Sequence, residues 1–322
     1  MNTELPATAH DAMPAGDSRL SAHGLQIVRL GPDEAIVKKG LSEVRCRLPG
    51  VADVLERVAE LADSGISEDI LVESFPPRIK SEIELLVRGL RARGLFEKAE
   101  DHTDSFWLSV GALAPNASVR LSEASALVVG NGPLADSMAS ALVGCGVGHV
   151  DTGSDMPKTE DCDLWCAAVE EPADPSLLVV AARALAAGVV FLPTWIDDLC
   201  IRVGPMTHPF DTACLRCYLL RADSNDPERE VHRLLRQQGN SDSCGAGFLP
   251  PMASVAGQIA GMEAVKYLSG LPVTTTGHVI EMSLVPFRCD VRRVLRVPRC
   301  PMCSGVTRQG APIVAVDPQL VE

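Results

Sequence analysis

Two cysteine pairs, Cys214-Leu-Arg-Cys217 and Cys300-Pro-Met-Cys303, constrain the fold of this chain more than any other feature. A C-x-x-C turn can hold two thiolates on one side of a metal ion, and two such turns supply the four ligands of a closed, tetrahedral zinc site. A redox-active pair, or chance spacing among 11 cysteines, would be the alternative. We expect Cys214, Cys217, Cys300 and Cys303 to bind a structural zinc ion that ties two remote segments together.

Composition excludes several classes of function. The net charge of −13 argues against general nucleic-acid binding, because phosphate recognition needs clustered cations. No run of about eighteen apolar residues appears, so no membrane-spanning helix is expected. The N-terminus carries no secretion signal, and a cysteine-rich chain without one is expected in the reducing cytoplasm. The remaining cysteines in apolar surroundings are then small core residues. They are Cys46, Cys145, Cys162, Cys166, Cys200 and Cys289.

The length of 322 residues suits two domains with a tail at each end. We expect a disordered tail over 1–18, a small domain over 19–104, an α/β domain over 105–305 and a flexible tail over 306–322. In the small domain, apolar alternation broken by Gly, Pro and Asp predicts three short antiparallel strands near 25–30, 35–37 and 44–48.

Three helices should follow these strands. The first carries apolar residues at helical spacing from Val51 and ends at Gly65, the second covers 68–74, and the third begins after Pro76-Pro77. Leu95-Phe96 is a candidate start of a wing strand. Three strands and three helices in this order suggest a winged helix-turn-helix.

A winged helix can bind DNA, but it can also add an extended peptide to an exposed strand edge. Arg78, Lys80, Arg88, Arg91 and Arg93 near the third helix keep the first use open. The mixed charge of the surface favours the second, with the peptide lying between the third strand (42–48) and the third helix (79–93). The expected contact residues are Val44, Cys46, Leu48, Ile79, Ile83 and Leu86. Taken singly, these apolar residues could equally be core.

A glycine turn opens the second domain. Ala126-Leu-Val-Val129 predicts a buried strand, and Gly130-Asn-Gly132-Pro-Leu-Ala135 then matches G-x-G-x-x-A ahead of a helix. That context is the one a dinucleotide fingerprint requires. However, Pro133 removes one backbone N–H from the turn, and the possible ribose ligands Asp151, Ser154 and Asp155 are only loosely placed. We interpret the turn at Gly130 and Gly132 as degenerate.

Further α/β repeats complete the domain. Strands are expected at 164–169, 189–192, 278–282 and 293–297, and helices at 177–187 and 253–268. Small residues along the last helix should let it pack closely on its neighbours.

These features together resemble the ThiF-like, ubiquitin-activating-enzyme-like fold over 124–305. The phrases Thr212-Ala-Cys-Leu-Arg-Cys217 and Pro298-Arg-Cys-Pro-Met-Cys303 narrow the resemblance to one branch. That branch comprises the cyclodehydratase partner proteins of thiazole/oxazole-modified peptide biosynthesis, a ribosomal natural product (bacteriocin and antibiotic) chemistry. In that family the N-terminal winged helix-turn-helix binds the leader of the precursor peptide.

The chain departs from active ThiF-like adenylating enzymes. Those enzymes carry an acidic ribose ligand and an Asn/Arg/Gln motif after the second strand, whereas residues 153–159 here contain neither Arg nor Asn. Cys244 is the best candidate nucleophile, but no base is visibly placed to activate it.

The resemblance therefore implies a non-catalytic partner. It would bind a peptide leader and present it to a separate YcaO-type cyclodehydratase that forms thiazolines and oxazolines; a homodimer is possible. One alternative is an ATP-dependent adenylyltransferase of the ThiF class that acts on a peptide or carrier-protein C-terminus. A winged-helix DNA-binding regulator is the second.

Overall fold

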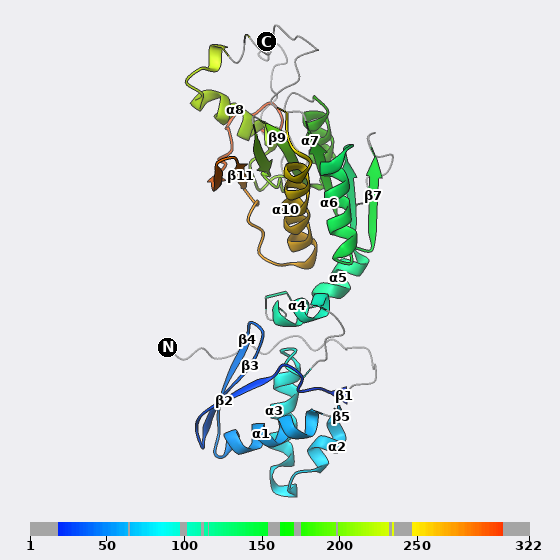
Figure 1. The fold of residues 1–322 in the computed structure, drawn as a ribbon, viewed down its shortest axis with the longest axis vertical. Coiled ribbons are helices and arrows are strands. Elements are labelled where there is room, and N and C mark those ends of the chain that lie inside the picture. The colour runs from blue at the N-terminus through cyan, green and yellow to red at the C-terminus, as the bar shows by residue number, and fades with distance from the viewer. Residues whose placement is uncertain are drawn as a thin grey trace. The chain divides into compact units, whose positions relative to one another are not determined.

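The chain divides into two compact units, residues 1–115 and 116–322 (Figure 1). The computed structural model describes residues 19–63, 65–96, 102–110, 113–114, 116–153, 162–170, 175–197, 199–231, 234 and 247–304. The predicted tails lie outside these residues. Helix α4 (His102–Val110), which crosses the expected boundary at 104/105, belongs to the first unit.

The first unit contains the predicted antiparallel meander. Strands β2 (Gln26–Gly31), β3 (Glu34–Lys39) and β4 (Ser42–Arg47) form a three-stranded sheet in sequence order. Gly40 forms the tight β3–β4 turn with φ of 57°, a backbone angle that favours glycine. β4 is an edge strand, because among the described residues it pairs with β3 on one side only. A second, two-stranded sheet pairs β1 (Arg19–Leu20) with β5 (Ile66–Ser67).

Three predicted helices follow. They are α1 (Val51–Ala62), α2 (Glu68–Glu73) and α3 (Lys80–Arg91), the last preceded by a 3-10 turn, η1 (Pro77–Ile79). The Ser67 hydroxyl caps α2 by accepting a hydrogen bond from the Ile70 amide at 3.4 Å. The prediction of a wing strand at Leu95 and Phe96 is wrong, since both residues form a turn and bury their side chains in the core.

A seven-stranded sheet forms the second unit, in the order β12-β11-β10-β9-β8-β6-β7. Its four strands from β7 to β9 are parallel and the remainder are antiparallel. The strands are β6 (Ser125–Val129), β7 (His149–Gly153), β8 (Leu164–Val169), β9 (Val190–Asp197), β10 (Cys200–Val203), β11 (His278–Leu284) and β12 (Phe287–Arg293). The last predicted strand, at 293–297, is wrong in position, because the strand ends at Arg293.

Helices cover both faces of this sheet, which gives a mixed α/β, Rossmann-like fold. They are α5 (Ala117–Glu123), α6 (Pro133–Gly144), α7 (Pro175–Ala187), α8 (Leu215–Asn225) and α10 (Pro250–Ser269). α7 packs on the face that bears Leu127 and Trp165, whereas α6 and α10 lie side by side on the other (Figure 1). Gly257 of α10 permits this approach, because a Cβ there would come 2.6 Å from the Leu134 carbonyl oxygen of α6.

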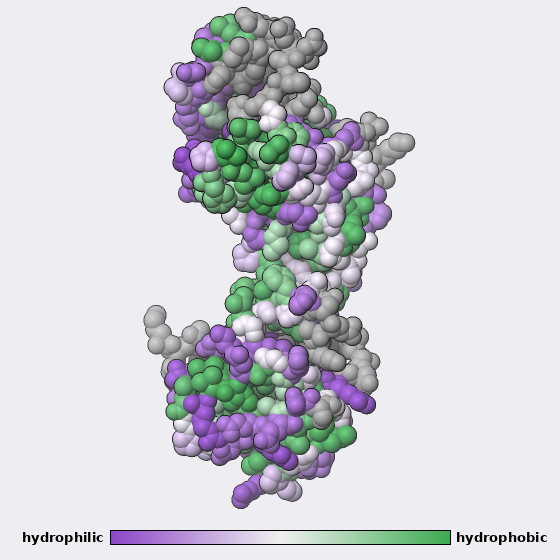
Figure 2. Space-filling view, viewed as in Figure 1, coloured by the Kyte–Doolittle hydropathy of each residue, from purple (hydrophilic) through white to green (hydrophobic). Residues whose placement is uncertain are grey.

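Apolar side chains reach the surface at the three-stranded and the seven-stranded sheet (Figure 2). In the first unit, Val28 and Leu30 of β2 are about half exposed. In the second, the edge strand β12 exposes Phe287, Val291 and Cys289. The prediction of a core position for Cys289 is therefore wrong. No helix of the described segments combines the length and apolar character needed to cross a bilayer.

Candidate metal centre and peptide groove

The two C-x-x-C turns meet in one buried cluster. All four cysteines are at most 3 % exposed, and their sulfur atoms lie within 4.8 Å of one another. The Sγ of Cys214 lies 3.8 Å from that of Cys217 and 3.6 Å from that of Cys300, and Cys217 and Cys303 are also 3.6 Å apart. Zinc–sulfur bonds of about 2.3 Å at tetrahedral angles place the sulfurs about 3.8 Å apart. The donor set therefore fits a zinc ion.

Local backbone geometry presents these thiols. Cys214 is the N-cap of α8, so Cys217 lies in the first turn of that helix. The second C-x-x-C turn is closed by a hydrogen bond of 3.0 Å from the Ser304 amide to the Cys300 carbonyl. The Val297 amide donates to the Cys217 sulfur at 3.3 Å. An amide donor at the sulfur favours the thiolate form, which is the form that a metal binds.

Two arginine side chains hold the second C-x-x-C turn against the first. Arg296 donates to the carbonyl oxygens of Phe210 at 2.7 Å and Cys303 at 3.0 Å. Arg221 of α8 donates to the Leu295 carbonyl at 2.6 Å and to that of Arg296 at 3.1 Å. Both guanidinium groups therefore bridge segments that the metal would also join.

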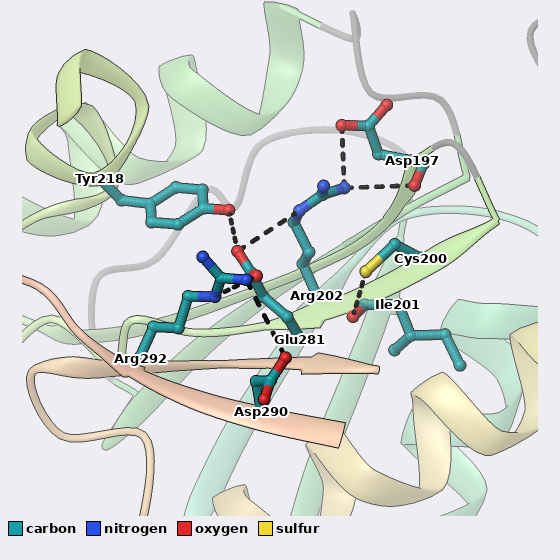
Figure 3. Close-up of polar contacts among 8 residues, drawn as sticks. All are labelled: Asp197, Cys200, Ile201, Arg202, Tyr218, Glu281, Asp290 and Arg292. Atoms are coloured by element: carbon teal, nitrogen blue, oxygen red, sulfur yellow. Dashed lines mark hydrogen bonds and ion pairs between the residues drawn. The ribbon is translucent and has the colours of Figure 1, made fainter. Parts of the chain in front are cut away.

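The residue after Cys217 anchors α8 on the sheet (Figure 3). The Tyr218 hydroxyl donates to Glu281 of β11 at 2.9 Å, and its ring packs edge-on against Trp195 with centroids 5.7 Å apart. Glu281 also pairs with Arg292 of β12 at 2.6 Å, while Arg202 of β10 donates to Asp197 at 2.9 Å. Burial raises the pKa of Tyr218, which keeps its hydroxyl a proton donor. Nothing in the sequence spacing predicted this network.

The glycine turn ahead of α6 is filled by a carboxylate from its own chain. Glu170, which follows β8, accepts a hydrogen bond from the Leu134 amide at 3.1 Å. A Cβ at Gly132 would come 2.6 Å from the same carboxylate oxygen, and the φ of 88° at this position also favours glycine. Gly130 is restricted by the backbone, since a Cβ would lie 2.1 Å from the Ala168 carbonyl oxygen. A negative charge thus occupies the helix N-terminus where a nucleotide phosphate would bind in a Rossmann-like fold.

Of the other candidate nucleotide and nucleophile residues, only Asp151 lies among the described residues. Asp151 lies within β7 rather than after it, and it pairs with His149 at 3.2 Å. Ser154, Asp155 and Cys244 lie outside the described residues.

The residues predicted to contact a peptide differ in burial. Cys46 of β4 and Ile83 of α3 are 8 % and 3 % exposed and belong to the core of the first unit. Val44, Ile79 and Leu86 pack against that core but remain partly exposed, and Leu48 is 52 % exposed. Side chains of β4 alternate as predicted, with Glu43, Arg45 and Arg47 on the exposed face.

Most cations beside the groove are neutralised by carboxylates of the same unit. On β4, both Arg45 and Arg47 hydrogen-bond to Glu34, which lowers the pKa of that carboxyl. Around α3, the pairs are Lys80 with Glu73, Arg88 with Glu84, and Arg91 with Glu68.

Comparisons with known proteins identify the architecture. No protein-family model and no curated protein matches the sequence. Among solved structures, a heterocyclase in complex with substrate and cofactor matches 88 % of this chain and 39 % of its own, with a TM-score of 0.68 and 17 % identity. The heterocyclase TruD matches 88 % and 42 %, with a TM-score of 0.66 and 15 % identity. The chain shares their fold.

E. coli MccB matches over nearly its whole length. In one structure it covers 88 % of this chain and 96 % of its own, with a TM-score of 0.58 and 14 % identity, and another MccB structure contains ATP. The Rossmann-like α/β fold expected from the sequence is thus confirmed, and the chain shares it with MccB and the two heterocyclases. This chain spans about two fifths of the length of the two heterocyclases.

Proposed function

We propose that this chain binds the leader of a ribosomally made precursor peptide and presents it to a separate YcaO-type cyclodehydratase. The observation that carries the proposal is the open edge of β4, a strand whose Cys46 shares one core with Ile83 of α3. An extended peptide can add to such an edge through backbone hydrogen bonds, while its alternate side chains contact the groove. In this role the chain itself is non-catalytic, and the enzyme converts Cys, Ser or Thr residues into azolines.

In this proposal the first unit is a winged helix-turn-helix used for peptide recognition. The order of three strands and three helices supports that assignment. Val44, Ile79 and Leu86 would contact the peptide, Cys46 and Ile83 would form the floor, and Leu48 would lie at the exposed end.

In this proposal the Rossmann-like unit provides a docking surface for the separate cyclodehydratase, or a dimer interface. A bound leader would then hold the modifiable segment at high effective concentration near the enzyme. The zinc ion would stabilise the fold and contact no substrate.

Adenylyl transfer is the main competing function, because MccB has been determined with ATP. The carboxylate of Glu170 at the α6 N-terminus opposes it, since this charge would repel a nucleotide phosphate. An ATP–pyrophosphate exchange assay separates the two, and robust exchange by this chain alone would establish the competitor. DNA binding is disfavoured by the pairing of Lys80, Arg88 and Arg91 with carboxylates.

The proposal is tested by titrating the full chain against a fluorescently labelled leader peptide. Leu86→Lys places a charge in the groove and should weaken binding by tenfold or more, because burying an unpaired charge costs at least about 1.4 kcal/mol. Leu85→Lys is the matched control, since Leu85 on the same helix is 67 % exposed. Equal affinities for wild type and folded Leu86→Lys would contradict the proposed groove.

A further inference from the structure

Helix α4 contacts both borders of the groove at one end. A Cβ at Gly40, just before β4, would lie 2.6 Å from the Ser109 Cβ of α4. A Cβ at Gly94, just after α3, would lie 3.7 Å from a methyl group of Leu108. α4 thus lies against the start of β4 and the end of α3, which gives the groove a closed end.

The closed end contains an unsatisfied polar group. Ser42, the first residue of β4, is 4 % exposed, and its hydroxyl has no hydrogen-bond partner among the described residues. It shares the groove-facing side of β4 with Val44 and Cys46. A buried hydroxyl without a partner is uncommon, because its desolvation is then uncompensated.

Arg93 lies in the turn between α3 and Gly94, at this same end. Its side chain is exposed and donates to the Gly89 carbonyl at 2.7 Å. Within the described part of the first unit, no carboxylate pairs with it, although Lys80, Arg88 and Arg91 of α3 each have one. Burial raises the pKa of the Cys46 thiol and the charge of Arg93 opposes that rise, so the guanidinium lies within electrostatic reach of the groove floor.

We propose that Arg93 selects peptides that carry an Asp or Glu at the closed end of the groove. This inference rests on the proposed peptide-binding function and adds its specificity. A guanidinium forms two parallel hydrogen bonds with a carboxylate, a geometry that lysine cannot reproduce.

The test selects a displayed library of randomised short peptides on the full chain. Wild type should enrich extended apolar peptides with Asp or Glu at one fixed position, and loss of the pair should cost such a peptide about tenfold in affinity. Arg93→Glu should instead enrich Lys or Arg at that position, and Arg93→Gln should show no charge preference there. Arg88→Glu, on the preceding helix α3, is the control and should keep the acidic preference.

The outcomes separate this inference from the function on which it rests. An acidic preference that persists in folded Arg93→Glu and Arg93→Gln, or apolar enrichment without any acidic position, overturns the role of Arg93 alone. Failure of wild type to enrich any peptide overturns the peptide-binding function itself.

Discussion

The cysteine cluster and the β4–α3 groove use polar groups in opposite ways. In the cluster, every thiol is buried and faces three others, and the surrounding amides and guanidinium groups already have partners within the chain. In the groove, a strand edge and the Ser42 hydroxyl lack such partners among the described residues, and Arg93 has a carbonyl partner but no carboxylate there. Groups satisfied internally contribute to folding, whereas groups left unsatisfied beside apolar walls are available for binding.

Loss of the metal ligands should have the largest effect. Cys300→Ser should unfold or grossly loosen the second unit, because structural zinc sites can contribute about 10 kcal/mol or more to folding. Cys289→Ser is the control, since Cys289 is exposed on β12. Metal analysis should find one zinc per wild-type chain, and chelation should lower the melting temperature. Unchanged stability after zinc loss would contradict a structural role for the cysteine cluster.

Removal of one hydroxyl beside the cluster should have a moderate effect. Tyr218→Phe removes the hydrogen bond to Glu281 and should destabilise the second unit by about 2 kcal/mol, a typical value for a hydrogen bond to a charged group. Tyr267→Phe is matched, because in the described segments no hydrogen bond involves the Tyr267 hydroxyl. Denaturant unfolding of both variants measures the difference, and equal losses would show that the hydroxyl adds nothing to the anchoring of α8.

Neutralising the Glu170 carboxylate in the glycine turn should lower the stability by less than removal of the Tyr218 hydroxyl does. Glu170→Gln weakens the favourable interaction with the α6 N-terminus and should lower stability by about 1 kcal/mol. Asp136→Asn changes another carboxylate in the first turn of α6, but an exposed one, and should have a smaller effect. Unfolding curves for the two variants provide the measurement. A larger loss for Asp136→Asn would contradict the assigned position of Glu170.

The smallest effect should come from the exposed ion pairs on the outer face of β4. Hydrogen bonds from Arg45 and Arg47 lower the pKa of Glu34 below its ordinary value of 4.5. The folded state therefore binds fewer protons, so this contribution is present above the unfolded-state pKa and is lost as the pH falls through the folded-state pKa. Glu34→Gln should be slightly less stable than wild type near neutral pH and equally stable in strong acid. A stability difference that persists in acid would show that the Glu34 side chain acts through packing rather than charge.

Local pattern was sufficient for much of the fold. The C-x-x-C spacing identified all four members of the cysteine cluster, and period-two and helical patterns located the meander, α1, α3 and α10. It failed at β12, where the predicted position was too late. An alternation of apolar and polar residues indicates a strand only when one face of the strand is buried, and nearly all of β12 is exposed.

The sequence by itself determined which residues can bind metal and which segments form helices and strands, because these depend on neighbours a few positions apart. Only the tertiary structure decided what fills the glycine turn, since β8 lies beside β6 and thereby brings Glu170 to Leu134 across 36 positions. Among the described residues it likewise left Arg93 without a carboxylate while pairing Arg91 with Glu68, 23 positions away. Charge pairing depends on distances in space, and no spacing along the chain specifies those distances.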